Sequence, residues 1–156
     1  MVAKLLHSQL CLLLLLGLLG IVPLLQAGPH GLPDYEWFRI QHIKNGSIQC
    51  NIEMLKINTY TRICKGFNTF LNINFTDAVN VCNNPVTMCH EGKSQNCHNS
   101  SVPVSITDCN LISPSDNITQ CKYSRNRSIS FYRIACDPIT PQVNDTLVPV
   151  HLDGTF

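Results

Sequence analysis

The chain has 156 residues, of which 44% are hydrophobic and 13% are charged, with a formal net charge of +1. This length suits one domain and leaves little room for two, and charge this sparse excludes a disordered polyelectrolyte. Nine cysteines are typical of a protein from an oxidising compartment, because cytosolic thiols stay reduced.

Residues 1–27 are predicted to be a secretory signal peptide. Lys4 precedes an apolar run at 10–25, and cleavage is expected after Ala27. The alternative is an anchor that stays in the membrane, but this run is shorter than the roughly 20 residues needed to cross a bilayer and contains Pro23. No later segment is long or apolar enough to span. The sequence therefore predicts a secreted, extracellular protein with no stable membrane insertion.

Residues 28–156 are predicted to form a single domain that begins with three helices. Segment 34–43 has acidic residues in its first turn, 51–63 has near-helical apolar spacing, and 74–81 continues into one apolar stripe that ends at Cys82.

Strands are predicted in the second half of the chain. Segment 102–106 alternates apolar and polar residues, 128–135 is rich in β-branched and aromatic residues, and 146–152 contains Pro149, which favours an edge or irregular position. Helices followed by strands predict an α+β domain with an antiparallel sheet.

Removal of the leader takes away Lys4 and Cys11, which leaves no net charge and an even number of cysteines: Cys50, Cys64, Cys82, Cys89, Cys97, Cys109, Cys121 and Cys136. Eight cysteines predict four disulfides, and spacing alone leaves about 105 possible pairings. Each bridge is expected to add roughly 2–4 kcal/mol by restricting the unfolded chain.

Glycosylation triplets of the form Asn-x-Ser/Thr are dense in the exported chain: Asn45, Asn74, Asn99, Asn117, Asn126 and Asn144. In the secretory pathway each is a candidate for a glycan at the surface. The alternative is that several stay unused, and Asn74 and Asn126 are the weakest candidates because they adjoin predicted regular structure.

The cluster Cys89, His90, Cys97 and His98 superficially resembles a set of metal ligands. Its spacing fits no standard zinc site, so disulfides are the better assignment. Phosphate-binding glycine loops, zinc-protease patterns and nucleophile elbows are absent from the sequence. Neither a metal nor a cofactor is predicted.

Three short segments are informative together: Gln-His at 41–42, Cys-Lys-Gly-Phe-Asn-Thr-Phe at 64–70 and Val-Pro-Val-His-Leu-Asp at 148–153. Spacing does not show that His42 and His151 meet. With these motifs and its cysteine order, however, the chain resembles the pancreatic-type ribonuclease superfamily. Trp37-Phe38 and the Leu after the second His resemble its eosinophil-associated branch.

The resemblance implies a bent antiparallel sheet with three α-helices and a cleft in which the two histidines converge. It also implies the disulfide pairs Cys50–Cys109, Cys64–Cys121, Cys82–Cys136 and Cys89–Cys97.

The implied activity is metal-independent, pyrimidine-preferring cleavage of single-stranded RNA through a 2′,3′-cyclic phosphate. His42 would be the general base that takes the 2′-OH proton, and His151 the general acid that protonates the leaving 5′-oxygen. Lys65 would stabilise the added negative charge of the transition state.

The resemblance also suggests supporting residues. Gln41 would touch the phosphate, and Asp153 would hydrogen-bond His151. Thr69 would bind the edge of a pyrimidine, with Asp108 tuning its hydroxyl. Asn96 would contact the base on the other side of the scissile bond.

The chain departs from the family in its charge. Many members of the branch are strongly basic, whereas Trp37, Ile40 and His90 stand here where cations are expected. Positive charge is concentrated instead in the C-terminal third, at Lys122, Arg125, Arg127 and Arg133. Because phosphate contacts dominate non-specific RNA affinity, the sequence predicts a modest ribonuclease with a shallow salt dependence and weak membrane damage.

The biological role leaves alternatives open. The first hypothesis is a secreted host-defence ribonuclease, delivered directly or through leukocyte granules. The second is an extracellular chemoattractant recognised by a leukocyte receptor, in which catalysis is incidental. The resemblance further suggests capture by the cytosolic leucine-rich ribonuclease inhibitor.

Overall fold

The computed structural model describes residues 28–156, apart from the side chains of His30 and residues 143–145. The predicted leader at 1–27 and its cleavage site lie outside the described residues. The α-helices are α2 (Asp34–His42), α3 (Cys50–Thr61) and α4 (Phe75–Val81). The strands are β1 (Phe67–Leu71), β2 (Val86–Thr87), β3 (Cys97–Asn99), β4 (Val104–Ser113), β5 (Lys122–Ser130), β6 (Tyr132–Thr140) and β7 (Val143–Thr155).

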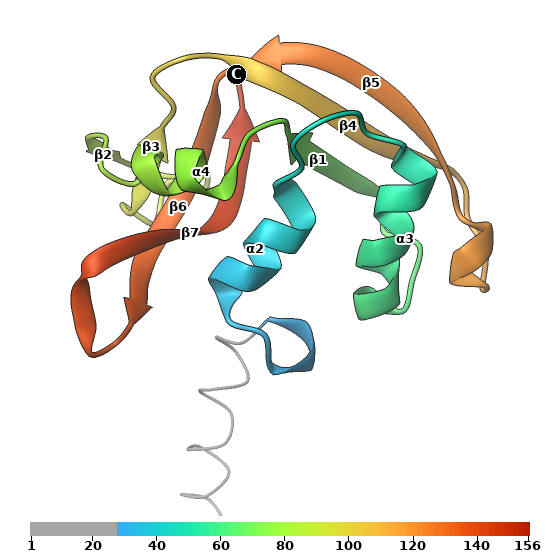
Figure 1. The fold of residues 1–156 in the computed structure, drawn as a ribbon, viewed down its shortest axis with the longest axis horizontal. Helices are drawn as coiled ribbons and strands as arrows, with labels where there is room; N and C mark the ends of the chain where they lie inside the picture. The colour runs from blue at the N-terminus through green and yellow to red at the C-terminus, as the bar shows by residue number, and fades with distance from the viewer. Residues whose placement is uncertain (1–27) are drawn as a thin grey trace, which may run out of the picture.

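The strands form two antiparallel sheets, so the described chain has the α+β fold that its sequence predicts. One sheet has the order β1-β4-β5 and the other has the order β2-β3-β6-β7. Figure 1 shows the two sheets as the arms of an open angle, with α2 between them, α3 against the first sheet and α4 beside the second. Short 3-10 turns at Pro29–Gly31 and Ile118–Gln120 complete the elements.

The chain bends between the two sheets at Phe131, which corrects the prediction of one strand over 128–135. Residues up to Ser130 pair with β4, whereas Tyr132 begins the pairing with β7. Phe131 exchanges two backbone hydrogen bonds of 3.0 Å with Phe156 at the end of the chain. Composition is strand-like on both sides of the bend, so the sequence pattern alone did not reveal it.

Other strands also differ from the prediction. Strand β1 lies in the half of the sequence that was expected to be helical, and β4 begins at Val104 instead of residue 102 and extends to Ser113. Strand β7 is longer than the predicted 146–152 and forms an edge of its sheet. Its pairing register shifts beside Pro149, as expected for an imino acid that cannot donate to the ladder.

Local sequence features explain where the helices begin and end. Helix α2 begins after Pro33 with Asp34 and Glu36 in its first turn, where carboxylates are favoured by the helix dipole. Helix α3 stops at Arg62, which adopts a left-handed φ of 65°. Helix α4 begins with a capping box between Asn74 and Asp77.

The two larger hydrophobic clusters pack the helices against the strands. Phe38 of α2 packs with residues of β6 and α4, including Ile134 and Ala78, while Met54 and Ile57 of α3 pack beneath Phe70 of β1. The four disulfides are Cys50–Cys109, Cys64–Cys121, Cys82–Cys136 and Cys89–Cys97, the pairs that the resemblance implies. Within residues 28–156, no helix is long and apolar enough to cross a membrane.

Candidate active site

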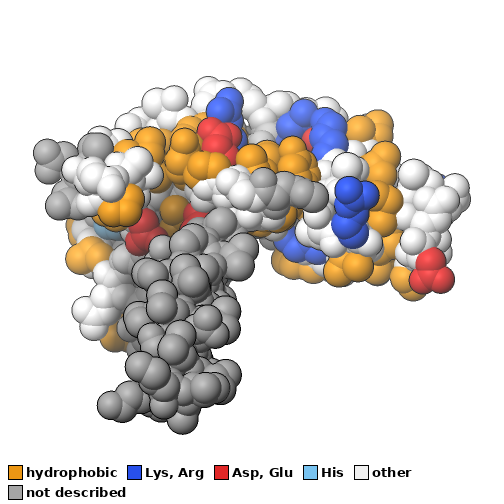
Figure 2. Space-filling model, turned by 90° about the horizontal axis from the view of Figure 1, so that it is seen from below, with side chains coloured by type: hydrophobic (Ala, Val, Ile, Leu, Met, Phe, Trp, Pro, Cys, Tyr) orange, Lys and Arg blue, Asp and Glu red, His pale blue; other side chains and the backbone are white. Residues whose placement is uncertain are grey.

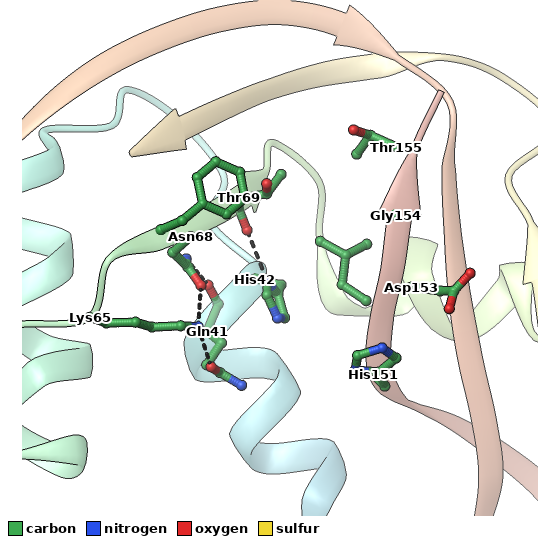
Figure 3. A pocket seen from close by; sticks show the side chains of 11 residues that line it. Gln41, His42, Lys65, Asn68, Thr69, His151, Asp153, Gly154 and Thr155 are labelled. Atoms are coloured by element: carbon green, nitrogen blue, oxygen red, sulfur yellow. Dashed lines mark hydrogen bonds between the residues drawn. The ribbon is translucent and has the colours of Figure 1, made fainter. Parts of the chain in front are cut away.

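A cleft of about 360 Å³ lies between β1 and the C-terminal part of β7. Its lining residues come from α2, from the segment around β1 and from β7: Gln41, His42, Lys65, Phe67, Asn68, Thr69, His151, Leu152, Asp153, Gly154 and Thr155. Figure 3 shows α2 and β1 carrying one wall and β7 carrying the other. The structure thus brings His42, Lys65 and His151, which lie far apart in the sequence, to one cleft.

His42 is the last residue of α2, and its ring is fixed by the neighbouring strand. Its Nδ1 lies 2.8 Å from the backbone oxygen of Thr69. Because a carbonyl oxygen can only accept, Nδ1 carries the hydrogen and Nε2 keeps a free lone pair. The pKa of His42 is lowered from 6.5 to about 3, chiefly by burial; the Thr69 hydrogen bond opposes this lowering, and the positive charges of Lys65 and His151 add to it. His42 is therefore neutral at physiological pH.

Lys65 extends its ammonium group into the same cleft and is held by neutral amides. Its Nζ donates to Oε1 of Gln41 at 2.8 Å and to Oδ1 of Asn68 at 2.9 Å (Figure 3). Burial lowers the pKa of Lys65 from its usual value. Among the described ion pairs none involves Lys65. Its charge is therefore oriented without being neutralised.

Two buried side chains, Asn58 and Tyr123, hold the backbone of Lys65 in place by hydrogen bonds. Its N–H donates to Oδ1 of Asn58 at 3.0 Å, and its carbonyl accepts from the hydroxyl of Tyr123 at 2.6 Å. Asn58 also donates from Nδ2 to the Tyr123 oxygen at 3.0 Å, and Asn58 is fully buried in α3. This closed network links the core of the first sheet to the position of the ammonium group.

Thr69 of β1 also lines the cleft, and its hydroxyl is hydrogen-bonded to the neighbouring strand. Its hydroxyl donates to Oδ1 of Asp108 at 2.6 Å, and the two residues are directly opposite each other in β1 and β4. A hydroxyl whose hydrogen is engaged in this way presents its oxygen lone pair to the cleft. Asp108 itself is not among the lining residues, and its hydrogen bond with the Thr69 hydroxyl connects it to the cleft.

The expected hydrogen bond between Asp153 and His151 does not form. Oδ2 of Asp153 accepts from the backbone N–H of His90 at 2.9 Å and lies 3.6 Å from Nη1 of Arg133. In Figure 3 the carboxylate of Asp153 points away from the His151 ring. The reason is a register shift in β7: Arg133 pairs with Gly154 but Ile134 pairs with Leu152, so Asp153 sits in a bulge that re-aims its side chain.

Asn96 lies outside the described lining of this cleft. Its Nδ2 donates to Oδ1 of Asp137 at 2.9 Å and to the backbone oxygen of Cys136 at 3.3 Å. These bonds place Asn96 beside β6, on the side of that strand that pairs with β3, whereas His151 pairs with β6 from the other side, through β7. Gln41 does line the cleft, where it is bonded to Lys65.

Two contributors to the cleft were missed by sequence reasoning. Asn68 lies inside the quoted 64–70 motif but was given no role; it is buried and donates to the backbone oxygen of Gln41 at 2.7 Å, besides holding Lys65. The Asn58–Tyr123 pair carries no local signal, because its members are 65 residues apart.

The cationic residues of the C-terminal third do not form a single patch. Arg125 and Arg127 of β5 bond to the backbone oxygen of Ile48 and to the hydroxyl of Ser47, while Arg133 lies on β6 near Asp153. Figure 2, which views the molecule from below, shows small groups of Lys and Arg among hydrophobic and uncharged side chains. This distribution agrees with the absence of net charge in residues 28–156.

One cluster of residues has the composition of a metal site but not its chemistry. Ligand atoms of Cys89, Cys97 and Asp153 lie within 4.8 Å of one another. Both sulfurs are joined in a disulfide, so they offer no thiolate to a metal.

The glycosylation triplets are accessible to different degrees. Asn45, Asn74, Asn117 and Asn126 are exposed, and Asn99 is half-buried. The side chain of Asn144 lies outside the described part of the chain.

Comparisons with known proteins agree with the cleft. The family model described as "Pancreatic ribonuclease" matches residues 33–153. The chain is 52% identical to mouse "Eosinophil cationic protein 2" and 46% identical to both rat "Eosinophil cationic protein" and mouse "Ribonuclease 2B", with 98% of each chain covered. The chain therefore belongs to the pancreatic ribonuclease family, in its eosinophil-associated branch.

Proposed function

We propose that the protein is a secreted endoribonuclease that cleaves single-stranded RNA on the 3′ side of pyrimidines. The observation that carries this proposal is the convergence of His42, Lys65 and His151 on one cleft. RNA supplies its own nucleophile, the 2′-hydroxyl, so the reaction requires only proton transfer and stabilisation of charge at phosphorus.

His42 acts as the general base. Its Nδ1–H is held by Thr69, which leaves Nε2 free to accept the 2′-hydroxyl proton. The low pKa of His42 keeps the ring neutral in the free protein. A bound phosphate adds negative charge beside Lys65 and His151, and this charge raises the basicity of His42 when substrate is present.

Lys65 and His151 complete the reaction. As the 2′-oxygen attacks phosphorus, negative charge grows on the non-bridging oxygens, and the Lys65 ammonium stabilises it more strongly than in the ground state. His151 protonates the departing 5′-oxygen. The P–O5′ bond breaks, a 2′,3′-cyclic phosphate forms, and water then opens this ring with the roles of the two histidines reversed.

Pyrimidine preference is supported by Thr69. Its backbone N–H donates and its hydroxyl oxygen accepts, which matches the O2 acceptor and N3–H donor of uracil. A cytosine, whose N3 is an acceptor, requires the hydroxyl to turn away from Asp108.

Secretion is supported by the disulfides and by the exposed glycosylation triplets, both of which suit an oxidising compartment. Without net charge in residues 28–156, long-range attraction of RNA is weak, so we propose modest activity with a shallow dependence on salt.

The test uses refolded residues 28–156 and a pyrimidine-containing RNA. Replacement of either His42 or His151 by Ala is expected to lower kcat/KM by about 10²–10⁴-fold. Unchanged turnover in both variants would identify the activity as a contaminant and refute the proposal.

A further inference from the structure

Asn126 occupies a position on β5 that connects it to the base-binding end of the cleft. Asp108 of β4 pairs with Thr69 on one side and with Asn126 on the other. Residues directly opposite one another in neighbouring antiparallel strands project from the same face of the sheet. Thr69, Asp108 and Asn126 therefore form one row across the sheet, and Thr69 lines the cleft.

Asn126 is also accessible. It begins the triplet Asn126-Arg127-Ser128 and is exposed, and β5 is the outer strand of its sheet. Figure 1 shows β5 along the outside of the molecule, with β4 between it and β1. Its two neighbours in sequence, Arg125 and Arg127, are anchored to Ile48 and Ser47. Because side chains alternate along a strand, these arginines occupy the opposite face and leave the cleft face to Asn126.

We propose that Asn126 carries an N-linked glycan that screens the base-binding end of the cleft and limits the cleavage of long RNA. The inference rests on the proposed ribonuclease function. In the secretory pathway, Nδ2 of Asn126 forms a bond to the anomeric carbon of a lipid-pyrophosphate-linked oligosaccharide. The carbon–oxygen bond to phosphate breaks, the lipid pyrophosphate leaves, and the amide nitrogen loses one proton.

A glycan on Asn126 is long enough to reach the base-binding end of the cleft. Two strand spacings separate Asn126 from Thr69, which is about 10 Å, and a branched oligosaccharide of several sugars is longer than that. A dinucleotide needs only the cleft that Thr69 and His151 line, and Asn126 is not among the lining residues of that cleft. A long RNA must continue beyond the cleft in both directions, so it meets the glycan. With no net charge in residues 28–156 to offset this obstruction, the long substrate loses more than the short one.

Another exposed triplet, which begins at Asn117, provides a control. Asn117 caps the 3-10 turn at Ile118–Gln120, which contacts α3, and is not among the residues that line the cleft. A glycan there should leave the cleft open. Ser128 offers a matched pair of variants, because Ser128→Ala destroys the triplet of Asn126 whereas Ser128→Thr preserves it.

The experiment has two stages, both with the full chain expressed in and secreted from mammalian cells. First, glycopeptides are treated with a glycosidase that converts occupied Asn to Asp in ¹⁸O water, and occupancy at Asn126 is read by mass spectrometry. Second, kcat/KM is measured for a pyrimidine–adenosine dinucleotide and for a long polyuridylate with wild type, Asn126→Gln, Ser128→Ala, Ser128→Thr and Asn117→Gln.

We expect label at Asn126, and a several-fold rise in the ratio of long-RNA to dinucleotide kcat/KM in Asn126→Gln and Ser128→Ala alone. An unlabelled Asn126, or an occupied Asn126 with an unchanged ratio in both variants, would overturn the inference and leave the proposed function intact. Inactivity of every form on both RNAs, including enzymatically deglycosylated protein, would refute the proposed function and the screening with it.

Discussion

The Tyr123 hydroxyl makes a sharp test of how the core positions Lys65. Replacement by Phe removes one oxygen and leaves no cavity, but it leaves two groups without their partner: the Lys65 carbonyl, 2.6 Å away, and Nδ2 of Asn58, 3.0 Å away. Each unsatisfied buried group costs about 1–3 kcal/mol. We therefore expect the free energy of unfolding to fall by about 2–4 kcal/mol, since the Lys65 carbonyl is only partly buried.

The assay is chemical and thermal unfolding of oxidised residues 28–156. At about 3–5 °C per kcal/mol for a domain of this size, Tm should fall by about 10 °C. Below the transition, kcat should also decrease by about tenfold, because a loosened Lys65 backbone lets Nζ drift from its position. KM should change less.

Tyr35→Phe is the matched control. No described hydrogen bond involves the Tyr35 hydroxyl, so its loss should cost less than about 0.5 kcal/mol. Equal stability of Tyr123→Phe and wild type, or a loss of stability with kcat unaffected, would refute the claim that this network holds Lys65 in place.

Four further outcomes follow from the same structure. Lys65→Ala should lower kcat on a dinucleotide by about 10²–10³-fold with a smaller change in KM. A rise in KM with kcat unchanged would show instead that Lys65 binds the substrate and its transition state equally well. Asp108→Ala should free the Thr69 hydroxyl and shift the ratio of kcat/KM for uridine over cytidine substrates toward cytidine by about fivefold, worth about one hydrogen bond, and an unchanged ratio would remove Thr69 from base selection. The pKa of His42 is about 3 in the folded protein and 6.5 without burial, so the unfolded chain binds more protons between these two pH values. The free energy of unfolding, measured by denaturant titration, should therefore fall as the pH drops from about 6.5 toward 3. This fall should be shallower in His42→Gln. Removing the Cys89–Cys97 disulfide, whose cysteines are 8 residues apart, should lower the free energy of unfolding by about 2.5 kcal/mol. Removing Cys50–Cys109, with a separation of 59 residues, should lower it by about 4 kcal/mol. The reverse order in calorimetry would contradict the loop-entropy explanation.

The sequence correctly predicted those helices whose apolar spacing and first-turn residues lie within the helix itself. The apolar stripe of segment 74–81 and the acidic first turn at Asp34 indicated helices that the structure contains, within one or two residues at their ends. Strand β1 was missed because its five residues are too short for a period, and its pairing partner, β4, lies more than thirty residues later in the sequence. The bend at Phe131 depends on a change of partner strand, which composition does not encode.

In the cleft, too, short motifs indicate candidate residues, whereas contacts between distant segments are visible only in the structure. The spacing of the motifs did not show that His42, Lys65 and His151 meet; the family resemblance implied a cleft in which the two histidines converge, and in the structure all three residues line one cleft. Asp153 illustrates the limit: alternation along a regular strand would place it on the same face as His151, yet a bulge directs its carboxylate to His90 and Arg133. Asn58 and Tyr123 act on Lys65 through tertiary contacts, which no motif in the sequence reports.

The central claim is that His42 and His151 cleave RNA through its own 2′-hydroxyl. The most direct measurement uses a DNA oligonucleotide that contains one uridine, incubated with wild-type protein in the presence of EDTA, with products identified by mass spectrometry and ³¹P NMR. We predict a single cut after the uridine, a 2′,3′-cyclic phosphate on one fragment and a 5′-hydroxyl on the other. Cleavage of the all-deoxy control, a requirement for added metal, or a 5′-phosphate at the cut would contradict the account.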